Sequence, residues 1–132
     1  MKTVHVAGKR KRAIARASLR KGTGIIRVNS LALVYLNPQL ARFMIEEPLQ
    51  LAGDLAKDVD IDVFVHGGGW HSQAEASRLV VARALVQYSG SKALKQTFLD
   101  YDRHLLVQDV RRAEPSKPND SKPRRARQKS YR

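Results

Sequence analysis

The feature that most constrains the fold of this chain is its C-terminal segment, residues 111–132. It contains no Val, Ile, Leu, Met, Phe or Trp and carries nine Lys and Arg residues against two acids. Such a segment buries too little apolar surface to offset the entropy lost on ordering, so we expect it to be disordered on its own. Any hydrophobic core must therefore come from the remaining 110 residues. The sequence predicts one globular domain, residues 1–110, followed by an extended basic tail, residues 111–132.

The charge of the chain is divided between two basic blocks. The formal net charge is +13, and residues 1–45 hold ten Lys and Arg residues and no acid. Residues 46–110 are slightly acidic, with six basic and ten acidic residues, and the tail is basic again. This asymmetry predicts two surfaces that contact a polyanion, carried on a scaffold of nearly balanced charge.

Several classes of protein are disfavoured by composition. There is no Cys, and no two of the four His residues have the helical spacing of a zinc pair, so we predict no metal and no cofactor. The N-terminus has no signal-peptide core, and the longest hydrophobic run, residues 31–36, is too short to span a bilayer. We expect a soluble, cytoplasmic protein without a membrane partner.

The strands are predicted from alternating polarity. Residues 12–21 place Arg12, Arg16 and Arg20 on one face of a strand and small apolar residues on the other. Residues 4–7 form a short strand that the basic run 9–12 interrupts, and a turn at 22–24 leads to a second strand at 25–28. Residues 59–65 alternate clearly and predict a half-buried strand, and residues 105–107 are a candidate last strand.

The helices are predicted from their boundary residues. Asn37 and Pro38 start a helix that Pro48 ends, and a second short helix covers residues 49–56. Ser72 and Glu75 fit a capping box for a long helix that reaches about residue 88, before Gly90. Ser91 caps a further helix over residues 92–100. Together these elements predict an α/β (α+β) fold.

The first basic block is a candidate RNA surface. An ordinary solvated strand face mixes charges of both signs, whereas this block has no acid, which favours contact with phosphate groups. The candidate contacts are Lys9, Arg10, Lys11, Arg12, Arg16, Arg20 and Lys21 in this block, and Arg111, Arg112, Arg124, Arg125 and Arg127 in the tail. Tyr131 and Arg132 fit either nucleic-acid contact or a frayed terminus.

The glycines Gly67, Gly68 and Gly69 lie between a predicted strand and a predicted helix. They fit either backbone contact with phosphate at the helix N-terminus, which Arg78 would assist, or a plain turn. His66 and the glycines resemble an esterase oxyanion loop, but there is no Gly-x-Ser-x-Gly nucleophile. We therefore predict no enzymatic activity. Asp58, Asp60 and Asp62 share one face of the predicted strand. Three carboxylates in a row could bind a divalent ion, but we favour the simpler interpretation that they form the solvated face of a half-buried strand.

Taken together, these motifs resemble small-subunit ribosomal protein nine. The resemblance rests on residues 8–17 and 21–24, on the three glycines followed by residues 73–78 and 82–85, and on the ending 128–132. The order of the motifs covers essentially the whole chain, and the ending is similar to the archaeal or eukaryotic type.

The resemblance implies a fold, a function and partners. The implied fold is a two-layer sandwich with a left-handed β-α-β crossover, as in the second domain of small-subunit ribosomal protein five. The implied function is that of a structural constituent of the small ribosomal subunit, which binds the ribosomal RNA of the head (3′ major domain) beside neighbouring ribosomal proteins. The tail is implied to reach the anticodon stem-loop of the peptidyl-site transfer RNA, through Lys129, Tyr131 and Arg132. The alternative is an RNA-processing subunit similar to the protein of ribonuclease P.

Overall fold

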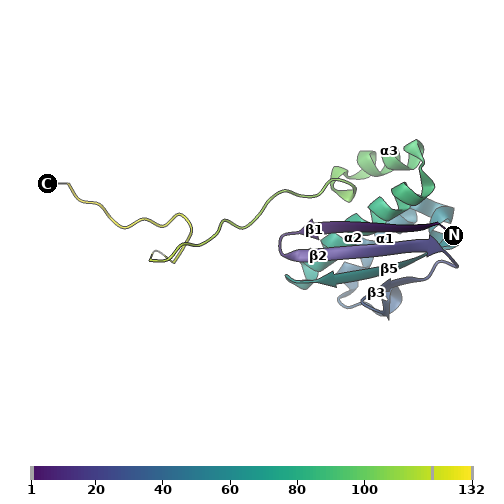
Figure 1. Cartoon of the computed structure of the whole chain (residues 1–132), viewed down its shortest axis with the longest axis horizontal. Coiled ribbons are helices and arrows are strands. Elements are labelled where there is room, and N and C mark those ends of the chain that lie inside the picture. Colours follow the sequence, from purple (N-terminus) through teal and green to yellow (C-terminus); the bar gives the residue numbers. More distant parts are fainter. Residues whose placement is uncertain (1, 120, 132) are drawn as a thin grey trace.

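The computed structural model describes residues 2–119 and 121–131 and contains one mixed sheet with helices packed on one of its faces (Figure 1). The five strands are β1 (Thr3–Arg10), β2 (Ala13–Lys21), β3 (Ile26–Val28), β4 (Leu31–Ala32) and β5 (Val59–His66). The helices are α1 (Gln39–Ala52), α2 (Trp70–Ser89) and α3 (Lys92–Tyr101), with short 3-10 turns η1 (Leu33–Tyr35), η2 (Gly53–Asp58) and η3 (Arg103–Leu105). The predicted α/β class is confirmed.

The hairpin of β1 and β2 forms because small residues alternate along it. Ala13, Ala15, Ala17 and Leu19 are buried against α2, as their positions in the sequence predicted. Gly8 is needed on β1, since a Cβ there would lie 2.8 Å from the Leu79 side chain of α2. The predicted limits of β1 were wrong, because the strand continues through Lys9 to Arg10 and pairs along its whole length with β2.

The predicted strand at 25–28 forms as β3, but it does not pair with β2, the strand that precedes it. The strand order is β1-β2-β5-β3-β4, so β5 lies between β2 and β3 and runs parallel to β3. The Asp60 carboxylate explains the local path, because it accepts hydrogen bonds from the backbone N–H groups of Thr23 (2.9 Å) and Ile25 (3.0 Å). These bonds hold the segment that crosses the start of β5 on its way to β3. The central position of β5 buries Val59, Ile61, Val63 and Val65.

A predicted helix end and a predicted strand were also wrong. Pro48 does not end α1 but lies buried inside it, where packing in the core offsets the missing backbone hydrogen bond. Residues 105–107 form no strand, because the chain turns through η3 and buries Leu105. Gly90 does end α2 in the left-handed conformation, and Ser91 caps α3 as predicted.

Beyond η3, the described residues of the tail form neither helix nor strand, and they extend away from the body (Figure 1). The parallel strands β3 and β5 are joined through α1, and the left-handed crossover remains a prediction. In the part of the chain that the structure describes, no helix has the length and apolar character needed to cross a bilayer.

Candidate nucleic-acid interface

Three segments that are distant in the sequence meet at one end of the sheet. The antiparallel pairing of β2 with β5 places Ile14 opposite His66, so the turn between β1 and β2 lies beside the glycines that follow β5. The contact is tight, because a Cβ on Gly67 would lie 2.5 Å from the Arg12 carbonyl oxygen. The tail leaves the body from this same end (Figure 1). We call this region the basic end.

The glycine loop, residues 67–69, shapes the start of α2. Gly67 and Gly68 have φ angles of 80° and 65°, which favour glycine, and Gly69 is the N-cap of the helix. Gly69 has no side chain that could cap the helix, so the backbone N–H groups of the first turn, at the positive end of the helix dipole, receive no side-chain hydrogen bond from the N-cap. The predicted capping box was wrong, because Glu75 is directed to Arg10 rather than to the N-cap.

Arg10 joins the three segments of the basic end. Its guanidinium lies 2.6 Å from the Glu75 carboxylate on α2 and 3.3 Å from the Asp109 carboxylate at the root of the tail. The Arg10 and Asp109 side chains are only 12% and 14% exposed. Hydrogen bonds from the Arg111 side chain and backbone, together with the Arg10 charge, hold the pKa of Asp109 well below its ordinary value. These four residues, Arg10, Glu75, Asp109 and Arg111, form the Arg10 cluster.

The outer face of the sheet continues the basic end along β2. Arg16 and Arg20 are exposed on this face, opposite the face that packs on α2. Arg20 lies 3.8 Å from Asp62, which also pairs with Arg27 at 3.6 Å. Phe64 of β5 pairs in register with Arg16 and is 59% exposed, so an aromatic ring lies among the arginines.

Phe64 is a candidate contact that the sequence reasoning missed. The signal was present, because Phe64 has the outward parity of Asp60 and Asp62 on an otherwise alternating strand. An exposed ring beside guanidinium groups is suited to stacking on a nucleic-acid base.

The remaining predicted RNA contacts lie in different environments. Lys11, Arg12 and Lys21 are exposed, and Lys9 is half-buried. Arg78 is 14% exposed and pairs inside the protein with Glu47 (2.6 Å) and Asp102 (3.2 Å), so it links α2 to α1 and to the start of η3. Its predicted contact with RNA stays a prediction.

The tail carries its cations mostly at the surface. Arg111 and Arg112 bond to Asp109, and Arg124 pairs with Glu114 at 2.8 Å. Arg125, Arg127, Lys129 and Tyr131 are exposed on the extended chain. The predicted transfer-RNA contact Arg132 lies outside the described residues.

The aspartates of β5 make hydrogen bonds and ion pairs within the protein. Asp60 holds the turn before β3, and Asp62 faces Arg20 and Arg27. The backbone hydrogen bonds from Ile25 and Thr23 lower the pKa of Asp60. Among the described residues, no three His, Cys, Asp or Glu side chains are grouped to hold a metal ion.

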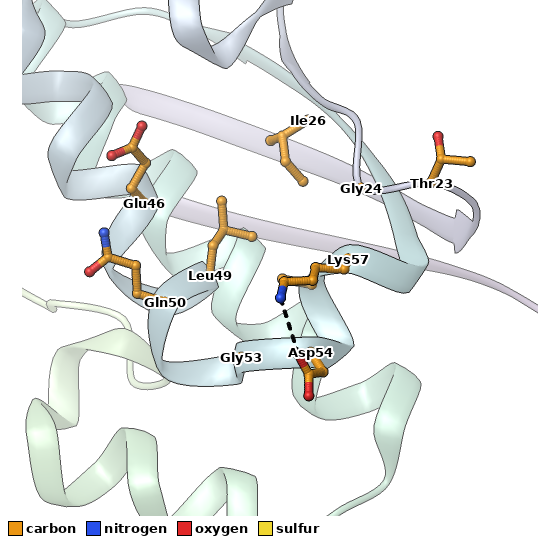
Figure 2. A pocket seen from close by; sticks show the side chains of 10 residues that line it. Thr23, Gly24, Ile26, Glu46, Leu49, Gln50, Gly53, Asp54 and Lys57 are labelled. Atoms are coloured by element: carbon orange, nitrogen blue, oxygen red, sulfur yellow. Dashed lines mark hydrogen bonds and ion pairs between the residues drawn. The ribbon is translucent and has the colours of Figure 1, made fainter.

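A hollow of about 490 Å³ lies between α1, η2 and the start of β3 (Figure 2). Ile26 and Leu49 contribute apolar surface, and Asp54 and Lys57 at the rim bond to each other. No Ser, Cys or His is among the ten residues that line this hollow.

The comparisons with known proteins agree in pointing to one family. The chain matches the family model described as "Ribosomal protein S9/S16" over residues 8–132. It is 48% identical over 134 residues to the small ribosomal subunit protein uS9 of Methanococcus maripaludis strain C5, and 47% identical over 134 residues to that of Methanococcus vannielii. Each alignment covers 100% of both chains. These matches favour the small-subunit interpretation over the ribonuclease P alternative.

Proposed function

The chain belongs to the ribosomal protein S9/S16 family, and on this premise we propose that its basic end binds the ribosomal RNA of the small-subunit head while its tail reaches the peptidyl-site transfer RNA. Membership in this family indicates a structural constituent of the small ribosomal subunit that takes part in translation, rather than a catalyst. The proposal adds which surfaces make the two contacts and which residues carry them.

The convergence of three segments at the basic end is the observation that carries the proposal. The turn between β1 and β2 supplies cations, the glycine loop supplies backbone N–H groups at a helix N-terminus, and the root of the tail supplies further cations. Such a combination suits phosphate groups, which are recognised by charge and by backbone donors. The proposed contacts are Lys9, Lys11, Arg12, Arg16, Arg20, Lys21, Gly67, Gly68, Gly69, Arg111, Arg112, Arg124, Arg125 and Arg127.

Arg10 and Arg78 are set apart from these contacts by their partners within the protein. Each guanidinium is mostly buried and faces two carboxylates of the protein, so its charge is largely balanced internally. We propose that Arg10 joins β1 to α2 and the root of the tail, and that Arg78 joins α2 to α1 and η3, in addition to any contact of these two residues with RNA.

The tail is proposed to act as a separate unit, residues 111–132, beyond the domain of residues 1–110. Its composition favours ordering on RNA, since its cations replace counterions of the phosphates. Lys129, Tyr131 and Arg132 at its end are the proposed contacts with transfer RNA.

The salt dependence of RNA binding tests the proposed rRNA surface. The variant Arg12→Ala/Arg16→Ala/Arg20→Ala should bind small-subunit rRNA more weakly, and its slope of log affinity against log salt should fall by about 2–3. The matched control Lys57→Ala/Lys92→Ala/Lys95→Ala removes the same charge from exposed positions of η2 and α3. Equal slopes for the two variants would overturn the proposal.

A further inference from the structure

The residues around β4, η1 and the start of α1 present a surface that the proposed RNA contacts do not explain. Residues 28–41 contain no charged side chain, although the chain has 25 Lys and Arg and 12 Asp and Glu residues. Six large hydrophobic side chains are exposed there or beside it: Leu31, Val34, Tyr35, Leu40, Phe43 and Trp70. We call these six residues the apolar patch.

The apolar patch is held in a defined shape. The Arg42 guanidinium donates a hydrogen bond to the Val34 carbonyl oxygen (3.1 Å), which ties η1 to α1, and it lies 5.3 Å from the centre of the Phe43 ring. Val34 and Tyr35 nevertheless remain 62% and 70% exposed. A surface that is ordered before binding loses little side-chain entropy when a partner arrives.

A hollow of about 210 Å³ adjoins the patch. Leu31, Leu36 and Trp70 contribute to its lining, and so does Ser77, whose hydroxyl oxygen is buried and has no hydrogen-bond partner among the described residues. The lining also contains the amide side chains of Asn29, Asn37 and Gln73, and it contains no charged residue. The hollow therefore suits a side chain with an apolar body and an uncharged polar group.

Charge decides which kind of partner fits this surface. Residues 28–41 carry no cation of their own, and the Arg42 guanidinium that touches them is 26% exposed and lies 3.7 Å from the Glu46 carboxylate. A phosphate placed there would lose water and gain little compensating charge, so RNA is a poor occupant. Exposed Tyr, Phe and Trp side chains are enriched at the centres of protein–protein interfaces. From these observations we propose that the apolar patch is the docking surface for an uncharged, apolar segment of a neighbouring protein in the small subunit.

This inference rests on the proposed place of the chain in the small subunit. It assigns the contact with RNA and the contact with a neighbouring protein to two separate surfaces. Trp70 directly follows the glycine loop, so the apolar patch begins where the basic end stops. From there it extends towards β4, which is the edge strand farthest from β1. RNA and protein can therefore be held side by side without sharing residues.

A photo-crosslinking experiment in assembled small subunits tests the inference. The photoreactive residue p-benzoylphenylalanine replaces Tyr35, and in the control protein it replaces Tyr101, which is 55% exposed on α3. We expect position 35 to form a covalent link to a different protein of the subunit, and position 101 not to link to that protein. Links from position 35 only to RNA, only to a second copy of this chain, or to nothing at full occupancy would overturn the inference.

A competition experiment gives a second readout. Tyr35→Lys should lose about tenfold in occupancy against the wild-type protein during assembly, whereas Tyr101→Lys should compete nearly equally. Equal competition by both variants would contradict the inference. Failure of the wild-type protein itself to enter the subunit would instead count against the proposed function.

Discussion

At the scale of single residues, the glycines of the loop at residues 67–69 have different structural roles. The sequence left open whether they contact phosphate or only form a turn. Gly67 has a φ of 80° and lies against the Arg12 carbonyl oxygen, whereas an added Cβ on Gly69 would meet nothing within 4 Å. The structure therefore assigns the tight turn to Gly67 and leaves space for a phosphate group beside Gly69.

Gly67→Ala should lower the free energy of unfolding by about 1–3 kcal/mol, because the new Cβ requires a strained backbone and a close contact. Gly69→Ala should cost less, about 0.5 kcal/mol, because Ala is a poorer N-cap than Gly but its Cβ meets no atom. Urea denaturation of the two variants measures the difference, and equal stabilities would contradict the assignment. A loss of RNA binding by folded Gly69→Ala protein would support backbone contact with phosphate.

Arg10 and Lys9 are neighbours in the sequence with different expected roles. Arg10→Gln should destabilise the protein by about 1–3 kcal/mol, because it leaves Glu75 and Asp109 without their shared cation. Lys9→Gln should leave stability within about 0.5 kcal/mol and weaken RNA binding. Thermal unfolding and RNA titration of both variants check this, and a stable Arg10→Gln protein would show that the Arg10 cluster does not hold the tail root.

At the scale of elements, prediction from the sequence succeeded for several local patterns, although the local capping box at Ser72 and Glu75 was wrong. The alternation in β2 and β5 and the cap at Ser91 depend on neighbouring residues, and all were found. The neighbour of β3 depends instead on a pairing with β5 across more than thirty residues, which no local pattern contains. Pro48 was misjudged because burial in the core, a property of the whole fold, decided its position.

The two predicted helix caps give a matched pair of variants. Ser91→Ala should cost about 1 kcal/mol of stability, because its hydroxyl accepts the Leu94 N–H at the start of α3. Ser72→Ala should cost less than about 0.5 kcal/mol, since Ser72 does not cap α2. Chemical denaturation distinguishes them, and a larger effect at Ser72 would restore the capping box.

At the scale of the whole molecule, the two basic blocks could be predicted from the sequence, but their convergence at one end of the sheet could not. Residues 9–12, the glycine loop and the tail root come together only through the sheet order and the Arg10 cluster. Sequence reasoning assigned Arg10 and Arg78 to RNA contact without their ion pairs, because the partner carboxylates are distant in the sequence. These partners are Glu75 and Asp109 for Arg10, and Glu47 and Asp102 for Arg78. Sequence reasoning also gave no role in binding to Phe64 or to the apolar patch.

The central claim is that one molecule holds rRNA with its body and reaches the peptidyl-site transfer RNA with its tail. The most direct test is the dissociation rate of that transfer RNA from purified small subunits that carry the full-length protein or a variant lacking residues 129–132, at equal occupancy. The account predicts full assembly of the variant and dissociation faster by a few-fold to about tenfold, since only a few charge-assisted contacts are lost. Equal dissociation rates at low salt would contradict it.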